Sequence, residues 1–126
     1  MKSRIAEVDG IKFVARDKEE GELSTTITFM FRAMCPVPVS PNPYSGNIQI
    51  SFRAQNGIDF QAVKDAVDGI CLDGLNSAED VVDRTAMWLK RHLSSMSVYT
   101  ITLMIPEQPF HLNVKIMRTE ELRDTP

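Results

Sequence analysis

Histidine and cysteine are scarce in this sequence, with two of each among 126 residues. No apolar run approaches the roughly 18 residues of a membrane span, and the N-terminal stretch MKSRIAEVDG lacks the apolar segment of a signal peptide. These absences predict a cytoplasmic protein without a membrane partner. In that reducing compartment Cys35 and Cys71 are expected to be free thiols rather than a disulfide.

Positive charge is not in excess either, since the formal net charge is -3. Nucleic-acid binding usually shows as clustered lysines and arginines, so no nucleic-acid partner is predicted. Hydrophobic residues make up 43% of the chain and charged residues 25%, which is typical of a soluble globular protein. A chain of 126 residues is expected to form a single domain, residues 1–126.

Four segments alternate apolar and polar residues with the period of a half-buried strand. They span residues 25–33, 47–52, 98–105 and 110–116. The four residues PEQP between the last two segments predict a hairpin connection. The predicted inward residues are Ile27, Phe29, Phe31 and Ala33, then Ile48, Ile50 and Phe52, then Tyr99, Ile101, Leu103 and Ile105, and finally Phe110, Leu112, Val114 and Ile116.

Two segments between these strands change to helical periodicity. Residues 59–71 begin with Asp59 as the predicted N-cap. Residues 77–93 begin with Ser77 three residues before Asp80, the spacing of a capping box. The predicted buried stripes are Phe60, Val63, Val67 and Ile70 in the first helix and Val82, Ala86, Leu89 and Leu93 in the second.

The predicted order is strand, strand, helix, helix, strand, strand, which indicates an α+β fold with a four-stranded antiparallel sheet. Two helices can cover only one face of such a sheet, so polar residues are predicted on the other face, and the sheet edges need a partner. The core is predicted over about residues 25–117, with residues 1–24 as an N-terminal arm or strand and residues 118–126 as a polar tail.

The stretch FRAMCPVPVSPNPYSGNIQISF, residues 31–52, places Cys35 where the first strand gives way to a segment with four prolines. That segment is too long for a tight hairpin, so a role beyond reversing the chain is predicted for it. A thiolate is a strong nucleophile, and a loop at a strand end can present it to a pocket between subunits. A buried, inert thiol is the alternative.

The element order from about Thr25 to Met117 resembles the tunnelling fold. In that fold the sheets of several subunits join edge to edge into a barrel, with the helices outside and ligand sites at the subunit boundaries. Its members include pyruvoyltetrahydropterin synthases, GTP cyclohydrolases and 7-cyano-7-deazaguanine reductase, which share purine-like or pterin-like ligands. The resemblance therefore implies a homo-oligomer that binds a purine, a deazapurine or a pterin.

One stretch is similar to the nitrile reductase branch in particular. That branch carries a Phe, three residues, Cys-Pro, four residues, Pro and Asp; Phe31, Cys35, Pro36 and Pro41 match, and Asn42 stands in place of the aspartate. The resemblance implies that Cys35 attacks a nitrile to form a thioimide and that Asn42 occupies the place of the proton donor. An amide can hydrogen-bond a substrate but cannot carry a proton to it at neutral pH.

A glutamate at the start of the second helix holds the purine-like base in the reductase family, and Glu79 in NSAEDVVDR occupies the matching place. Its carboxylate can accept two N–H donors from a guanine-like edge, while a helix-start acid favoured by the helix dipole is the alternative. By similarity to pterin-binding relatives, Glu107 or Gln108 is a second candidate anchor for the base, and a solvated hairpin is the alternative there.

The second substrate stays open. Of the acidic-Ser-Lys-Ser-like segment that helps the reductases to hold NADPH, DFQAVK keeps only the acid and Lys64, so NADPH is one alternative. The archaeosine amidinotransferase forms the same thioimide but uses an amine and no nicotinamide, and its shorter length is closer to that of this chain.

A pterin synthase is a further alternative, because GIDFQAVKDAV, LDGLN and AED resemble that family as well. Its three zinc-binding histidines are missing, and His111 with Cys35 would supply only half of a metal site, so no metal is predicted. A non-catalytic member of the fold, which binds a ligand or only assembles, is the remaining reading.

Overall fold

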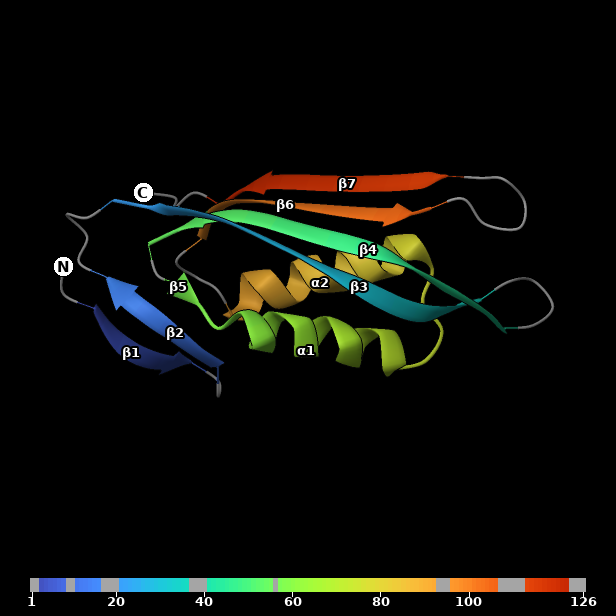
Figure 1. Cartoon of the computed structure of the whole chain (residues 1–126), viewed down its shortest axis with the longest axis horizontal. Helices are drawn as coiled ribbons and strands as arrows, with labels where there is room; N and C mark the ends of the chain where they lie inside the picture. Colours follow the sequence, from blue (N-terminus) through green and yellow to red (C-terminus); the bar gives the residue numbers. More distant parts are fainter. Residues whose placement is uncertain are drawn as a thin grey trace.

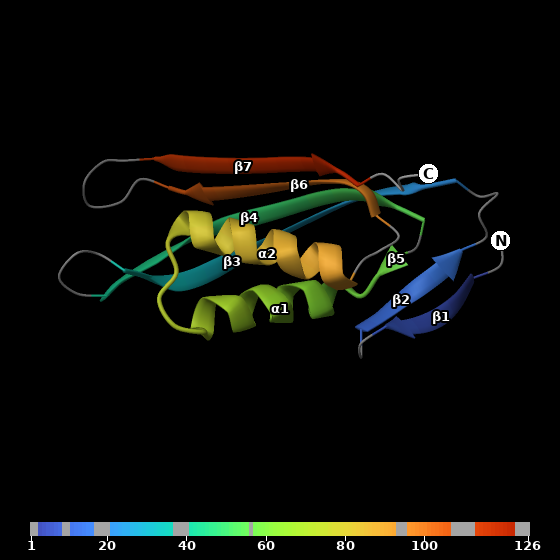
Figure 2. The same cartoon turned by 180° about the vertical axis from the view of Figure 1, so that it is seen from behind.

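The computed structural model describes residues 3–8, 11–16, 21–36, 41–55, 57–92, 96–106 and 113–122, with side chains from Gly21 onward except those of Pro41 and Asn42. Four strands form an antiparallel sheet in the order β3-β4-β6-β7, and two helices lie on one of its faces (Figures 1 and 2). The predicted α+β class and element order are confirmed for this sheet. The bounds are β3 Leu23–Pro36, β4 Pro41–Ala54, α1 Phe60–Leu72, α2 Ala78–His92, β6 Met96–Ile105 and β7 Val114–Glu121.

A second, three-stranded sheet lies at the end of the molecule where α1 begins (Figure 1). It consists of β1 (Ser3–Val8), β2 (Ile11–Arg16) and β5 (Gly57–Ile58), in the order β1-β2-β5. The sequence predicted an N-terminal arm or strand, and the chain forms a hairpin there. The prediction missed β5 because two residues are too few to show a strand period.

Both helices begin at the predicted caps. The Asp59 carboxylate accepts the Gln61 amide at 3.0 Å. The Ser77 amide donates to the Asp80 carboxylate at 2.9 Å and the Asp80 amide donates to the Ser77 hydroxyl at 3.1 Å, which is a reciprocal capping box. These bonds from Ser77 hold the pKa of the Asp80 carboxyl below its ordinary value.

The core lies between the helices and one face of the main sheet. All predicted inward residues of β4 and β6 are buried, whereas on β3 Phe31 and Ala33 are buried and Ile27 and Phe29 only partly so. Fully burying such a side chain contributes about 1.5–3 kcal/mol, so this layer is the main source of stability. The buried helical residues are Val63, Val67 and Cys71 in α1 and Val81, Val82, Thr85, Ala86 and Leu89 in α2.

The predicted stripe of α1 is wrong at both of its ends. Phe60 is 56% exposed, since it is the first residue of the helix and has no preceding turn beside it. Ile70 is half-buried, and Cys71 takes the inner position instead. In α2, Leu93 lies outside the described residues.

The hairpin of β3 and β4 is longer than predicted. Both strands are 14 residues long, and their pairing continues as far as Pro36 opposite Pro41. The long proline loop expected between them is therefore wrong, because only residues 37–40 separate the two strands. The pairing of β4 with β6 ends at Asn47, so the prolines of β4 before Asn47 remove no hydrogen bond of that ladder.

The place where β4 leaves β6 is marked by Gly46. A Cβ at this position would clash with the Met104 carbonyl oxygen, so only glycine fits. From this point the tip of the hairpin extends past the end of β6 (Figures 1 and 2).

The last strand extends farther toward the C-terminus than predicted. β7 spans Val114–Glu121 and so continues into the predicted polar tail, while residues 110–112 of the predicted strand, with Phe110 and Leu112, lie outside the described residues. Val114 and Ile116 on its inner face pack against the core. The rest of this face is charged, because Arg118 pairs with Asp83 of α2 at 2.8 Å and Glu120 pairs with Lys90 of α2 at 2.7 Å. Ion pairs with the helix replace apolar burial here, which is why hydrophobic periodicity did not reveal these residues.

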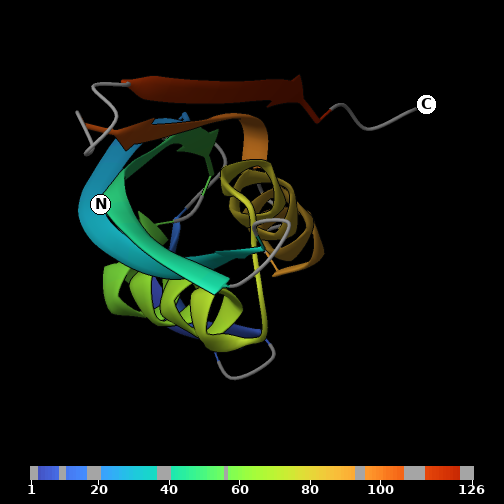
Figure 3. The same ribbon diagram turned by 90° about the vertical axis from the view of Figure 1, so that its right-hand side faces the viewer.

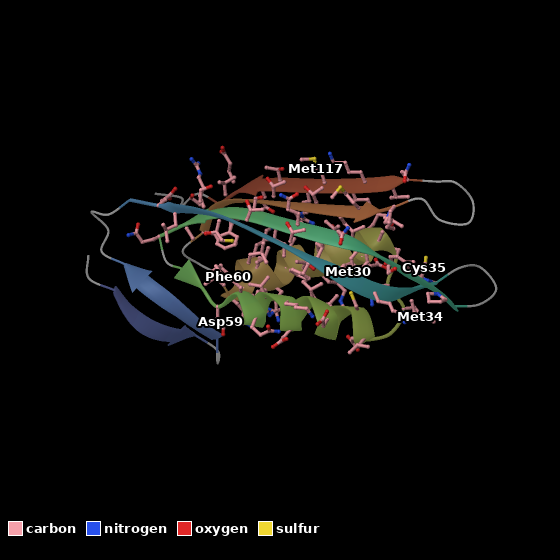
Figure 4. All side chains as sticks on the ribbon, viewed as in Figure 1. Met30, Met34, Cys35, Asp59, Phe60 and Met117 are labelled. Atoms are coloured by element: carbon pink, nitrogen blue, oxygen red, sulfur yellow. The ribbon has the colours of Figure 1, made fainter. Side chains whose placement is uncertain are left out.

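We define the open face of the main sheet as the face away from the helices (Figure 3). This face is polar and rich in methionine, and Figure 4 labels Met30, Met34 and Met117 on it. Hydroxyl groups pair across the strands, Thr26 with Ser51 at 3.1 Å and Thr100 with Thr119 at 3.0 Å. The polar character expected of this face is thus seen. Four methionines on it are 37% to 71% exposed: Met30, Met34, Met104 and Met117.

Candidate functional site

Cys35 lies near the tip of the long hairpin, one residue before the end of β3 (Figure 4). Along β3 the residues facing the helices alternate, and Phe31 and Ala33 before it are 3% and 2% exposed. Cys35 continues this row and is half-buried, with a free thiol. It therefore stands at the rim of the core, where the cover of the helices ends.

Asn42 is directly opposite Cys35 in the register of β3 and β4. Cross-strand partners of an antiparallel pair are close neighbours, with Cβ atoms about 5 Å apart. The backbone therefore brings together the two positions that the sequence resemblance pairs as nucleophile and proton donor. The side chain of Asn42 lies outside the described part of the structure.

Glu79 is the second residue of α2 and is exposed. Its neighbour Asp80 is held in the capping box by Ser77. Glu79 has no such role in the cap, and among the described residues its carboxylate makes no ion pair. It lies at the helix N-terminus, where negative charge is favoured.

Tyr44 of β4 connects these predicted residues. Its ring meets the edge of the Phe31 ring at 5.7 Å between centroids and 77° between planes. Burial raises the pKa of its hydroxyl, and nearby acidic groups raise it further. The groups that raise it are Cys71, Cys35, Asp80 and Glu79.

The turn between α1 and α2 lies against the same end of the hairpin. The Asn76 amide donates to the Met34 carbonyl at 2.8 Å, and the Asn76 carbonyl accepts the Tyr44 hydroxyl at 2.8 Å. Gly74 in this turn has φ +80°, which favours glycine. Because Met34 precedes Cys35 and Asn76 precedes the α2 cap, these bonds bring Cys35 to the N-terminal end of α2.

Sequence reasoning missed Tyr44 and Asn76. LDGLN was interpreted only as a break between helices, although an asparagine immediately before a capping box can bond the preceding turn. Tyr44 lies two residues after Asn42, in a segment that was predicted to be a loop. The alternation of β4, had it been extended backward from Ile48, would have placed it inward.

Glu107, Gln108 and His111 lie outside the described residues, so their predicted roles stay predictions. The strand ends on either side of them, Ile105 of β6 and Val114 of β7, point to the same end of the sheet as the hairpin tip (Figure 1).

Two depressions lie near this end without including Cys35 or Glu79. One, of about 490 Å³, follows the edge of β3 beside the end of α1. The other, of about 210 Å³, lies on the outer surface of the two helices. Their linings are Met30, Phe31, Arg32, Ser45, Asp68 and Leu72 in the first and Ile70, Arg84, Met87, Trp88 and Arg91 in the second.

Within the part of the chain that the structure describes, no group of three or more His, Cys, Asp or Glu side chains is placed to hold a metal ion. No described helix is long and apolar enough to cross a membrane. Comparisons of the chain with known protein families, with curated proteins and with solved structures find no match.

Proposed function

We propose that the protein is a tunnelling-fold enzyme of the 7-cyano-7-deazaguanine type, which binds a deazapurine and attacks its nitrile through Cys35. The observation that carries this proposal is the hydrogen bond from the Asn76 backbone amide to the Met34 carbonyl, which joins the strand residue before Cys35 to the turn before α2, where Glu79 lies. The two residues are 44 positions apart in sequence, and this bond joins the segments that carry them. A nucleophile and an anchor for the base are the minimum that such an adduct requires.

The proposed step is an addition without oxidation or reduction. The Cys35 thiol loses its proton, and its sulfur bonds to the nitrile carbon while one π bond of the nitrile breaks. The nitrile nitrogen takes up a proton, which leaves a neutral thioimide. Asn42, opposite Cys35, is suited to hydrogen-bond this nitrogen but not to supply the proton, so we assign proton delivery to solvent.

Glu79 supports binding of the base. Its exposed carboxylate at the N-terminus of α2 can accept two N–H groups of a guanine-like edge. The base then lies across the rim of the core, with its nitrile directed to the thiol.

Assembly would complete the site. β3 and β7 are the outer strands of the main sheet, and the described helices both lie on the face opposite the open face. Edge-to-edge joining of such sheets would form the barrel of a tunnelling fold and bring a second subunit to the open rim near Cys35. Sedimentation velocity is expected to show a homo-oligomer, and a stable monomer at micromolar concentration would count against the barrel.

A non-catalytic pterin-binding or purine-binding member of the fold is the second candidate. Asn42 in place of an acid, together with the lack of a metal-binding cluster among the described residues, favours it. Both candidates place the ligand at Glu79, and they differ in whether Cys35 forms a covalent bond. Neither of these two features indicates which second substrate, an amine or NADPH as a hydride donor, would react with the thioimide.

Intact-protein mass spectrometry after incubation with 7-cyano-7-deazaguanine tests the covalent step. One ligand mass is expected on the wild type and on Cys71→Ala, and none on Cys35→Ala. Glu79→Gln should raise the concentration for half-saturation about tenfold, because one charge-assisted acceptor is lost. An unmodified wild type at saturating ligand would remove the nitrile chemistry and leave the binding protein.

A further inference from the structure

We propose that Asn76, held by Tyr44, is the positioning residue that sets Cys35 against Glu79. This inference rests on the proposed function for its chemistry, but its geometry can be tested separately.

Asn76 is buried, with 1% of its surface exposed. Its backbone and its side chain each donate and accept hydrogen bonds. Its amide donates to the Met34 carbonyl at 2.8 Å, and its carbonyl accepts the Tyr44 hydroxyl at 2.8 Å. Its carboxamide donates to the Ile70 carbonyl at 3.0 Å and accepts from the Arg84 guanidinium at 2.8 Å. A buried polar group that is satisfied on every side has a single favoured position.

These contacts reach four of the described elements. Met34 belongs to β3, Tyr44 to β4, Ile70 to α1 and Arg84 to α2. Asn76 is thus the residue through which the hairpin and both helices are joined by hydrogen bonds.

Both proposed reactive groups are close to this residue along the chain. Cys35 follows Met34 directly, and Glu79 lies three residues after Asn76, past the Ser77 cap. A displacement of Asn76 would therefore change the separation of the thiol from the base anchor. Reaction rates are sensitive to such displacements, and an ångström can change them by about a hundredfold.

We call Asn76 and its hydrogen-bond partners Met34, Tyr44, Ile70 and Arg84 the Asn76 node. Arg84 holds the outer side of this node. Its guanidinium pairs with the Asp73 carboxylate at 2.6 Å and also donates to the Asp73 and Ile70 carbonyl oxygens. This fork closes the end of α1 over Asn76. On the inner side, the raised pKa of Tyr44 keeps its hydroxyl protonated, so it remains a donor over the working pH range.

Tyr44→Phe is the sharpest test, because it removes one hydroxyl and keeps the ring that packs on Phe31. Replacing Asn76 itself risks unfolding the chain. The matched control is Tyr99→Phe, since the chain has only two tyrosines and Tyr99 also donates a hydroxyl hydrogen bond, to Glu120 at 2.7 Å. Tyr99 pairs with Phe52, eight positions along β4 from Tyr44, and so lies far from the hairpin tip.

The first measurement needs no ligand. Nitroxide labels are placed on Cys35 and on Glu79→Cys in the Cys71→Ala chain, labelled chain is diluted into unlabelled chain, and the distribution of label distances is recorded by electron resonance. Tyr44→Phe is expected to broaden the distribution about twofold, and Tyr99→Phe to leave it unchanged. An unchanged distribution in Tyr44→Phe overturns the positioning role.

The second measurement is the rate of adduct formation with 7-cyano-7-deazaguanine at saturation, with Cys35 and Glu79 intact. Tyr44→Phe should lower this rate constant about tenfold or more, while Tyr99→Phe keeps it within about twofold of wild type. An unchanged rate in Tyr44→Phe overturns the inference even if the distances broaden. If the wild type forms no adduct, the proposed function is overturned instead. The distance measurement alone then decides whether the Asn76 node positions Cys35 against Glu79.

Discussion

The two tyrosines of the chain lie at opposite ends of the main sheet and are held in different ways. Tyr99 donates to the Glu120 carboxylate, which also pairs with Lys90 and lies 3.6 Å from Arg118. Tyr44 donates to a backbone carbonyl of the buried Asn76. One end is thus joined by partly exposed charges, and the other by the buried hydrogen bonds of Asn76, with the Arg84–Asp73 ion pair on their outer side.

The difference shows how each end can respond to its surroundings. Exposed ion pairs are weakened by salt and by titration, and each contributes little. Buried hydrogen bonds are insensitive to salt, but a lost partner leaves a polar group unsatisfied at a cost of about 1–3 kcal/mol. The candidate site lies at the end that carries Tyr44 and Asn76. The contacts that support it are therefore rigid, while Cys35 itself lies at the open rim of the core.

Thiol labelling is expected to give the largest effect. It tests whether Cys35 at the rim of the core is accessible to a reagent while Cys71 in the interior is not. Burial, and then the charge of Asp68, raises the pKa of Cys71 from 9.0 to about 11. At pH 8 this leaves about a hundredfold less thiolate than an ordinary cysteine has, and the thiolate is the reactive form. Iodoacetamide followed by peptide mass spectrometry should therefore find the label on Cys35 and not on Cys71.

The pH dependence of that labelling has a definite sign. Because the folded pKa of Cys71 is raised, its neutral thiol contributes stability below pH 9 that is lost as the pH rises through about 11. Cys71 labelling should increase over this range together with unfolding. Equal labelling of both thiols at pH 8 would show that the interior next to the rim is open as well.

Asn76→Ala against Glu120→Gln compares the two ends directly. Removal of the Asn76 carboxamide takes away a buried hydrogen bond to the Ile70 carbonyl and another from the Arg84 guanidinium, so a loss of about 2 kcal/mol in unfolding free energy is expected. Glu120→Gln should cost about 0.5 kcal/mol, and less at high salt. Urea denaturation measures both, and equal losses would abolish the contrast between the ends.

Acid titration is expected to show the smallest effect. Hydrogen bonds from Lys90 and then Tyr99 lower the pKa of Glu120 from its ordinary 4.5. Its contribution is therefore complete above that pH and is lost as the pH falls through the folded pKa. Glu120→Gln should lose less stability than wild type between about pH 7 and pH 3.

Tyr44→Phe is the control for this titration. Its hydrogen bond goes to a backbone carbonyl, which does not titrate, so this variant should keep the acid sensitivity of the wild type. If Tyr44→Phe lost less stability in acid than the wild type, a titrating group would also contribute to stability at the end of the sheet that carries the Asn76 node.

Most of the main sheet could be predicted because its burial follows a period of two. Ile48, Ile50 and Phe52 alternate with polar residues, and so do Tyr99, Ile101 and Leu103. The prediction failed where apolar burial is not the cause of structure. β7 holds its charged residues through ion pairs with α2, and the prolines of the hairpin tip lie past Asn47, where the pairing of β4 with β6 ends.

The candidate site was predictable in its residues but not in its support. Cys35 and Glu79 could be chosen by their types and their places at element ends. Asn76 could not, because nothing in LDGLN indicates that its polar groups reach β3, β4 and both helices. Those partners lie up to 42 residues away in sequence, between Met34 and Asn76.

The sequence by itself determined the class of the fold, the caps of both helices and the inner face of β4 and β6, since each depends on neighbours within a few residues. Only the tertiary structure decided that Cys35 faces Asn42 across a continuous ladder, that Tyr44 points inward, and that Asn76 joins the hairpin to α2. These depend on strand register and on contacts between distant segments, which the spacing of residues along one chain does not encode.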